Sequence, residues 1–397
     1  MKKKLHFAII GAGPTGLEAA LATAEHGYDF TLFEAAEQVA GHVHTWRHVR
    51  LFTPWRLNAS ARMRSALEQI GRSLPDDEIC PTGGELIEHL LEPLAATPAL
   101  KGHVQLGSKV LSVGRQGLLK HEEISSGERG SRPFRLLVED SEGRESLVYA
   151  DLILDCTGSS LPNTLGDAGI PAPGERHLAD RIMRDVPNLG QDADEWADKT
   201  TLLVGGGHSA QTALQDLLNL AELRPETKIV WTLRGDVPQP VDDDPLPERY
   251  RLTALAATAA VEPPPSLEVH RRSAVDGLAE LPNGRVQVTL RGESGEKKVE
   301  VDRVLSLTGR VGDHLLYRQL QVHECYATSG PMKLAAALLS SSGAGGDCLD
   351  QTSLGPETLR SPEPGFFILG SKSYGRRNDY LMQVGWQQVD EIFQLLD

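Results

Sequence analysis

Short apolar runs alternate with longer amphipathic segments along the chain. Two runs typical of buried strands, Leu5–Ile10 and Asp29–Glu34, flank a segment over 17–27 whose apolar residues recur at helical spacing. Near the end of the chain, the same patterns predict a strand over Phe366–Leu369 and an amphipathic helix over 380–396. Alternating strands and helices predict an α/β fold with largely parallel sheets.

This construction occurs twice, about half a chain apart. The second copy has a strand over Thr201–Val204, a helix over 211–223 and a strand over Lys228–Arg234. Each copy is followed by an apolar strand that ends in Thr-Gly, at Thr157-Gly158 and at Thr308-Gly309. The repeated order predicts two Rossmann-like dinucleotide-binding domains.

Glycines join the strand to the helix in the first copy. The turn GAGPTG contains Gly11, Gly13, Pro14, Thr15 and Gly16. A strand that turns directly into a helix presents free backbone N–H groups at the positive end of the helix dipole, which favours a pyrophosphate. In this interpretation Gly11 makes the tight turn, Gly13 lets the phosphate approach, and Gly16 lets the helix lie close to the strand. Glu34, about 20 residues further on, is placed to accept hydrogen bonds from ribose hydroxyls.

The second copy differs in charge. Its turn, GGGHSA, contains Gly205, Gly207, His208, Ser209 and Ala210. Arg234 stands where the first copy has Glu34, and a guanidinium there favours the 2′-phosphate of NADPH over the bare hydroxyls of NADH. His208 and Ser209 either contact the pyrophosphate or form a polar first turn of the helix.

Composition narrows the function classes. The 397 residues carry a formal net charge of −15, which repels nucleic acid, and no stretch approaches the roughly 20 apolar residues of a membrane span. Four cysteines without a CxxC motif indicate reduced thiols in a cytoplasmic protein. His42, His44 and His48 have no cysteine or carboxylate at metal-ligand spacing, so we expect no metal.

Both glycine motifs in this order resemble those of the two-dinucleotide-binding flavoproteins, the superfamily that includes thioredoxin reductases and flavin-containing monooxygenases. The resemblance covers almost the whole chain. It implies an FAD-binding domain made of residues 1–160 and 311–397, with an NAD(P)H-binding domain over 161–310 inserted between them. GAGPTG with Glu34 would hold FAD, GGGHSA with Arg234 would hold NADPH, and both Thr-Gly ends would lie beside the cofactors.

The same resemblance places the loop over 370–379 and the helix after it against the flavin. The usual Gly-Asp of that segment is here Gly370-Ser371, so contact to the ribityl chain would come from elsewhere, with Asn378 and Asp379 as candidates. The aromatic and basic segment Gly41–Asn58, including Trp46 and Arg47, is expected to pack on the flavin and contact substrate.

These features predict an FAD-dependent, NADPH-consuming oxidoreductase. Because no CxxC is present, disulfide reduction is disfavoured, and the more specific prediction is a monooxygenase that oxygenates a small molecule through a flavin hydroperoxide. Two alternatives stay open: a flavin reductase that passes electrons from NADPH to a quinone, a small oxidant or a protein partner, and a non-catalytic nucleotide-sensing flavoprotein.

Several assignments are left open by the sequence. It identifies no catalytic acid, base or nucleophile and no particular substrate. Cys325 and Cys348 are either a redox pair or two unpaired thiols. A homodimer is compatible with the sequence, which does not fix the oligomeric state.

Overall fold

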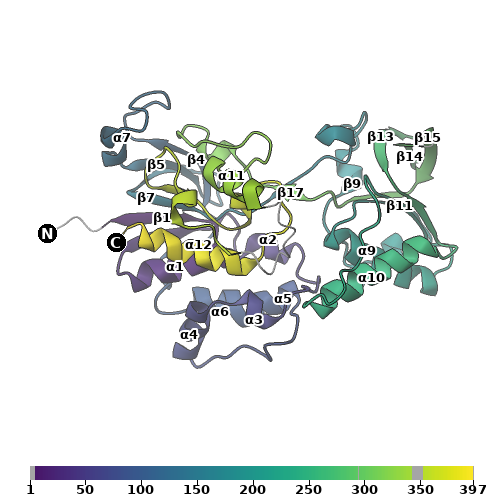
Figure 1. Ribbon diagram of the computed structural model, residues 1–397, viewed down its shortest axis with the longest axis horizontal. Coiled ribbons are helices and arrows are strands. Elements are labelled where there is room, and N and C mark those ends of the chain that lie inside the picture. Colours follow the sequence, from purple (N-terminus) through teal and green to yellow (C-terminus); the bar gives the residue numbers. More distant parts are fainter. Residues whose placement is uncertain (1–4, 294, 342–351, 397) are drawn as a thin grey trace. The chain divides into compact units, whose positions relative to one another are not determined.

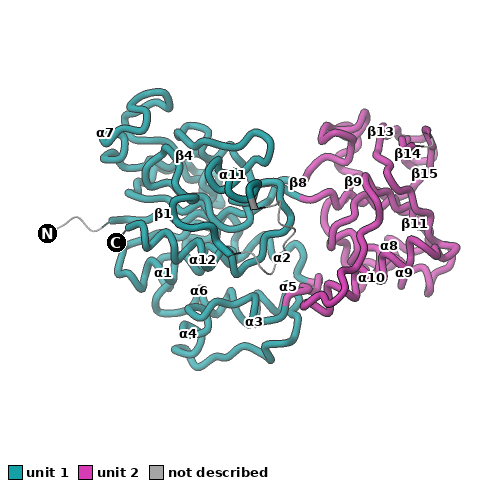
Figure 2. The backbone as a smooth tube through the Cα atoms, viewed as in Figure 1, with its two compact units in different colours: residues 1–47, 54–161, 310–397 teal, residues 48–53, 162–309 magenta. Residues whose placement is uncertain are grey.

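A computed structural model describes residues 5–293, 295–341 and 352–396, which form two compact units (Figures 1 and 2). Unit 1 lies within residues 1–47, 54–161 and 310–397, and unit 2 comprises residues 48–53 and 162–309. The chain therefore passes between the units four times. No helix in the described residues is long and apolar enough to cross a membrane.

A five-stranded parallel sheet forms the centre of unit 1, in the order β18-β7-β1-β2-β3. Its strands are β1 (His6–Ile10), β2 (Asp29–Phe33), β3 (Val104–Gln105), β7 (Leu152–Asp155) and β18 (Phe366–Ile368). The apolar residues of β1 are buried because parallel strands are covered on both faces. Helices α1 (Pro14–Glu25) and α12 (Met382–Gln394) pack against each other beside this sheet (Figure 1).

The other elements of unit 1 are short. Its helices are α2 (Gly41–His44), α3 (Trp55–Asn58), α4 (Ala61–Gln69), α5 (Gly83–Leu86), α6 (Glu92–Ala95), α7 (Gly127–Ser131) and α11 (Met332–Ser341). A π turn, η1 (Ile87–Leu91), joins α5 to α6, and 3₁₀ turns lie at η4 (Leu315–Tyr317), η7 (Pro356–Leu359) and η8 (Gly370–Tyr374). Strands β4 (Lys109–Arg115), β5 (Phe134–Glu139) and β6 (Glu145–Ala150) form an antiparallel sheet.

Unit 2 also has a five-stranded parallel sheet, in the order β12-β11-β10-β16-β9. Its strands are β9 (Ile182–Met183), β10 (Thr200–Val204), β11 (Lys228–Thr232), β12 (Leu267–His270) and β16 (Arg303–Ser306). The antiparallel sheet of this unit consists of β13 (Ser273–Glu280), β14 (Val286–Gly292) and β15 (Gly295–Val301). The helices are α8 (Ala193–Trp196), α9 (His208–Leu223) and α10 (Pro247–Val261), and 3₁₀ turns lie at η2 (Asp167–Gly169) and η3 (Ala179–Arg181). Strands β8 (Leu161–Pro162) and β17 (Arg310–Val311) pair with each other.

The two units repeat one plan. Strand β10 corresponds to β1, β11 to β2 and β16 to β7, with the same neighbours in the same order. In each unit a three-stranded antiparallel sheet precedes the strand that ends in Thr-Gly. The predicted α/β fold with two Rossmann-like domains is therefore confirmed.

Some sequence-based assignments need correction. The segment 161–199, whose Gly, Pro, Asp and Asn content predicts a surface connector, contributes strand β9 to the sheet and buries Trp196. The proline-dense stretch 237–250, which predicts a break between elements, already turns helical at Pro247, because proline is well tolerated in the first turn of a helix. The stretch SSSGAGGD, whose composition predicts a flexible loop, falls mostly on 342–351, which lies outside the described residues, as does Cys348.

Candidate dinucleotide-binding sites

The first glycine turn leads from β1 into α1. A Cβ on Gly11, whose φ is +98°, would lie 2.8 Å from the carbonyl oxygen of Cys156, and one on Gly16 would lie 1.8 Å from that of Gly11. Both positions therefore require glycine for close packing. Gly13, the N-cap of α1, is different, because a Cβ there would meet nothing within 4 Å. Its backbone faces open space at the positive end of the helix, which fits a phosphate.

Glu34 follows β2 and holds this turn through hydrogen bonds to its backbone. Its Oε2 accepts a hydrogen bond from the backbone N–H of Ala12 (2.8 Å), and its Oε1 accepts one from Ala36 (3.1 Å). Burial raises the pKa of the Glu34 carboxyl above its ordinary value. A carboxylate has about four lone-pair directions. The backbone of Ala12, Ala35 and Ala36 uses up to three of them, so Glu34 can still accept a hydrogen bond from a ribose hydroxyl.

Parallel pairing brings three distant segments to one edge of the sheet. Ile10 and Ile368 both pair with Asp155, so the turns that follow β1, β7 and β18 lie together. The Asp155 carboxylate accepts hydrogen bonds from the N–H (3.1 Å) and hydroxyl (2.7 Å) of Thr157. The Ser371 hydroxyl oxygen would be 3.5 Å from a Cβ on Gly158. The structure thus brings Thr157-Gly158 and Gly370-Ser371 close together at the carboxyl edge of the sheet.

The same edge contains a buried lysine that the sequence analysis missed. Lys372 donates from Nζ to Asp155 Oδ2 (2.6 Å) and to the Thr157 hydroxyl (3.0 Å), and its side chain is 1% exposed. A Cβ on Gly312 would overlap the Lys372 side chain, so this glycine makes room for it. The loop over 370–379 is polar in composition, yet it is buried over Lys372–Tyr374. The available signal was Asp155 within an apolar strand, because a buried carboxylate requires a partner.

Residues near the C-terminus contact Thr15, which follows Pro14 at the start of α1. The Tyr380 hydroxyl lies 3.3 Å from the Thr15 hydroxyl, and burial raises the pKa of Tyr380. Gln388 on α12 accepts a hydrogen bond from the N–H of Gly370 (2.9 Å). Asp379, a candidate for the ribityl contact, pairs with Arg377 at 3.0 Å.

Trp46 and Arg47 lie against the start of α5. A Cβ on Gly83 would be 2.7 Å from the Trp46 ring, and the Arg47 carbonyl accepts a hydrogen bond from the N–H of Gly84 (2.7 Å). The Arg47 side chain also pairs with Glu88 at 3.0 Å. These close contacts explain why glycine occupies positions 83 and 84. A contact of Trp46 or Arg47 with the flavin stays a prediction.

The second glycine turn, in unit 2, has the same geometry as the first. A Cβ on Gly205, whose φ is +132°, would lie 2.3 Å from the carbonyl oxygen of Leu307, whereas one on Gly207 would meet nothing within 4 Å. Gly207 is the N-cap of α9, and the Ala210 methyl would be 3.5 Å from a Cβ on Gly205. Trp231 fixes the turn by donating from its indole nitrogen to the Gly205 carbonyl at 2.8 Å.

Side chains around this second turn divide into buried and exposed ones. The His208 ring lies 4.6 Å from the Phe52 ring, and burial together with the Arg249 charge lowers the pKa of His208. His208 is therefore uncharged at neutral pH, so it offers a phosphate hydrogen-bond donors but no positive charge. Ser209 is exposed, and Arg234, two residues beyond β11, is exposed with no ion pair among the described residues.

Thr308 and Gly309 follow β16, and Thr308 is held by a hydrogen bond to another residue of unit 2. The Thr308 hydroxyl donates to the Asn163 carbonyl at 3.1 Å, and Gly309 has a φ of +86°. Because Val204 pairs with both Thr232 and Ser306, the turns that follow β10, β11 and β16 lie at one edge of this sheet.

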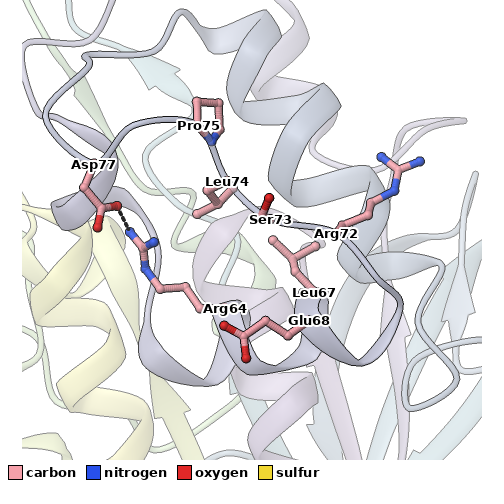
Figure 3. Close-up of a pocket in the computed structure, with 8 residues that line it drawn as sticks. All are labelled: Arg64, Leu67, Glu68, Arg72, Ser73, Leu74, Pro75 and Asp77. Carbon is pink, nitrogen blue, oxygen red and sulfur yellow. Dashed lines mark hydrogen bonds and ion pairs between the residues drawn. The ribbon is translucent and has the colours of Figure 1, made fainter.

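Two surface pockets lie apart from these turns. One, drawn in Figure 3, is formed by α4 and the turn after it, and Arg64 and Asp77 pair across it at 2.7 Å. The other lies in unit 2 at the amino ends of β10 and β16, opposite the glycine turn, and includes Lys199 and Arg303. Neither contains a residue of the two glycine motifs.

Known proteins share this arrangement. Residues 9–67 match the family model of the NAD(P)-binding Rossmann-like domain. A comparison with curated proteins found no match. The chain is similar to the solved structure of the bacillithiol disulfide reductase Bdr (YpdA) from Bacillus cereus, at 16% identity and a TM-score of 0.70, covering 99% of both chains.

Two further solved structures are similar. The cadaverine monooxygenase DfoA from Erwinia amylovora matches at 12% identity and a TM-score of 0.66, over 98% of this chain and 92% of that one. The ornithine hydroxylase PvdA from Pseudomonas aeruginosa matches at 16% identity and a TM-score of 0.64, over 99% and 98%. The chain therefore has the fold of the two-dinucleotide-binding flavoproteins.

Proposed function

We propose that this protein is an FAD-dependent oxidoreductase that takes its electrons from NADPH. The observation that carries the proposal is the pair of glycine turns. Each has an open N-cap glycine at a helix N-terminus, and they differ in the residue that follows the next strand, Glu34 in unit 1 and Arg234 in unit 2. A carboxylate suits the ribose hydroxyls of FAD, and a guanidinium suits the 2′-phosphate of NADPH.

The residues of unit 1 would hold FAD in a defined way. The open backbone at Gly13 would take the pyrophosphate, and Glu34 the adenosine ribose. Thr157-Gly158 and Gly370-Ser371 would line the flavin half, with Lys372 and Asp155 fixing Thr157 beneath it. When bound, FAD accepts a hydride from NADPH and passes the electrons to an acceptor. The domains would then be the FAD-binding segments 1–160 and 311–397 and the NADPH-binding segment 161–310.

A monooxygenase is the more specific function that we favour. DfoA and PvdA, which share the fold, are a monooxygenase and a hydroxylase of amines. Cys156 is the cysteine that adjoins the first glycine turn, and burial holds its pKa well above the ordinary value. It therefore remains a thiol at neutral pH and is poorly suited to attack a disulfide.

A reductase is the second candidate, because the bacillithiol disulfide reductase Bdr also shares the fold. The segment Ala327–Thr328 lowers the pKa of the Cys325 thiol below its ordinary value. A lower pKa increases the thiolate fraction, which would favour transfer of electrons to a sulfur acceptor.

Anaerobic reduction followed by reaction with oxygen tests these proposals. The purified protein should contain FAD, and NADPH should bleach its flavin absorbance much faster than NADH does. In air, with a panel of small amines, sulfides and ketones, NADPH consumption should yield an oxygenated product. Rapid anaerobic turnover with an artificial acceptor or a disulfide, with no oxygenated product in air, would favour the reductase. A protein that never exchanges a hydride with NADPH would contradict both.

A further inference from the structure

Residues 48–53, the crossing segment, belong to unit 2 although the residues on both sides of them belong to unit 1. His48 Nε2 lies 3.0 Å from the carbonyl oxygen of Val186, and Val49 packs on the apolar core that includes α9. Thr53 is buried. The crossing segment is therefore fixed to unit 2 at several points, rather than being a loose connection.

The crossing segment runs along helix α9 to its N-terminus. At one end, the His48 side chain lies near the carboxyl of Asp216, two turns into the helix. At the other end, the Phe52 ring lies 4.6 Å from that of His208, the first residue of the helix, at an angle of 46°. Phe52 thus lies at the end of the helix that carries the positive dipole.

We propose that Phe52 is a binding residue of the second dinucleotide site, where its ring, in contact with the His208 ring, forms an apolar wall beside the bound pyrophosphate. This inference rests on the proposed NADPH site. It assigns a binding role to a residue of the crossing segment, which the glycine motif does not contain.

An apolar wall would strengthen phosphate binding here, because the neighbouring His208 and Arg249 offer no free positive charge. His208 is uncharged at neutral pH, and the Arg249 guanidinium is paired with Asp244 at 2.7 Å. Neither supplies a free positive charge to a phosphate. Charge attraction at this end of the site therefore comes mainly from the backbone N–H groups at the start of α9. Their interaction with a phosphate is stronger where an apolar wall keeps water away.

Binding of NADP⁺ to the FAD-loaded protein tests the proposal, because NADP⁺ binds without reducing the flavin. Calorimetric titration would compare the wild type with Phe52→Ala, Phe52→Tyr and Val49→Ala. We expect Phe52→Ala to raise the Kd about fivefold to tenfold, which is the scale of one aromatic contact. Phe52→Tyr should restore binding, since it keeps the ring. Val49→Ala loosens the crossing segment without touching the ring and should change the Kd less than about twofold.

Kinetics and folding supply independent readouts. In Phe52→Ala the KM for NADPH should rise while the limiting rate of flavin reduction stays within about twofold of the wild type. Flavin content and melting temperature should be unchanged, because Phe52 is only half-buried. Together with rescue by tyrosine, this pattern would support the wall.

Other outcomes would overturn it. An unchanged Kd in Phe52→Ala means that the ring does not contact the nucleotide, and tighter binding means that Phe52 covers the site instead of lining it. An equal rise of the Kd in Val49→Ala would mean that the effect comes from loosening the crossing segment and not from loss of the Phe52 ring. If the wild-type protein binds neither NADP⁺ nor NAD⁺, the proposed function itself fails, which is a distinct result.

Discussion

The open N-cap glycine of each turn allows cofactor binding to be separated from folding. Gly13 has an ordinary φ of −78°, and a Cβ there would meet no protein atom within 4 Å, so we expect valine to be accommodated. The same side chain would occupy the space that a pyrophosphate needs. We expect Gly13→Val to fold with a near-normal melting temperature but to lose its FAD, as measured by absorbance near 450 nm.

A matched control is Gly114→Val, since a Cβ on Gly114, in strand β4, also meets nothing within 4 Å. This variant should retain its flavin. Normal flavin content in Gly13→Val would show that the first glycine turn does not hold FAD.

We expect Arg234 to decide the choice of nucleotide by charge. It is exposed and has no ion pair among the described residues, so its guanidinium is available to a 2′-phosphate. In Arg234→Glu we expect the Kd for NADPH to rise about tenfold to a hundredfold, the scale of one charged hydrogen bond, while that for NADH changes little. Lys298→Glu, on exposed strand β15, makes the same charge change elsewhere and should affect neither nucleotide. Equal losses for both nucleotides in Arg234→Glu would exclude phosphate recognition.

At the scale of elements, turn η8 is held to the end of β7 by a buried ion pair. Lys372→Met would leave the Asp155 carboxylate buried without its cation, which costs about 3–5 kcal/mol of unfolding free energy. Adding Asp155→Asn removes the unpaired charge and should recover more than half of the loss, because Thr157 can still donate to the amide oxygen. Urea denaturation of the three proteins measures this. A double variant no more stable than Lys372→Met would show that the pair does not act as a unit.

Elements with strong periodicity were predictable, and those set by tertiary contacts were not. The strands and helices around both glycine turns match the apolar pattern to within a few residues, as does α12. The antiparallel strands β4–β6 and β13–β15 were missed, because their partly exposed residues alternate with charges and resemble loops. Burial of Lys372 depends on Asp155, 217 residues away in sequence, and no local pattern reports such a pair.

For the whole molecule, the duplicated plan explains how the candidate sites arise. In each unit, the parallel strands before and after the glycine turn bring their carboxyl ends to one edge, so residues far apart in sequence meet there. The sequence repeat predicted this meeting. Strand β18 was predicted separately, from the apolar run Phe366–Leu369 and the resemblance that assigns 311–397 to the first domain. Strand β9 was not predicted, because it comes from a segment with almost no strand signal.

Unit 1 is discontinuous, and a buried charge cluster joins its parts. Glu363, near the end of the chain, pairs with Arg115 at 2.7 Å and with Arg129 at 2.9 Å, and all three side chains are at most 1% exposed. Glu363 also accepts a hydrogen bond from the N–H of Gln321 (2.8 Å). Glu363→Gln would leave two buried guanidinium groups without a counter-charge, so we expect a loss of about 3–5 kcal/mol in the unfolding free energy of unit 1.

Hydrogen exchange followed by mass spectrometry would locate this loss. Peptides from β4 and from the segment around Gln321 should exchange faster in Glu363→Gln, whereas those from α9 in unit 2 should be unchanged. Glu128→Gln is the control, because the Glu128–Arg132 pair on α7 is half exposed and should be worth less than about 1 kcal/mol. If both variants lost equally little, the terminal segment would be held by apolar packing, and the ion cluster would be incidental to the joining of unit 1.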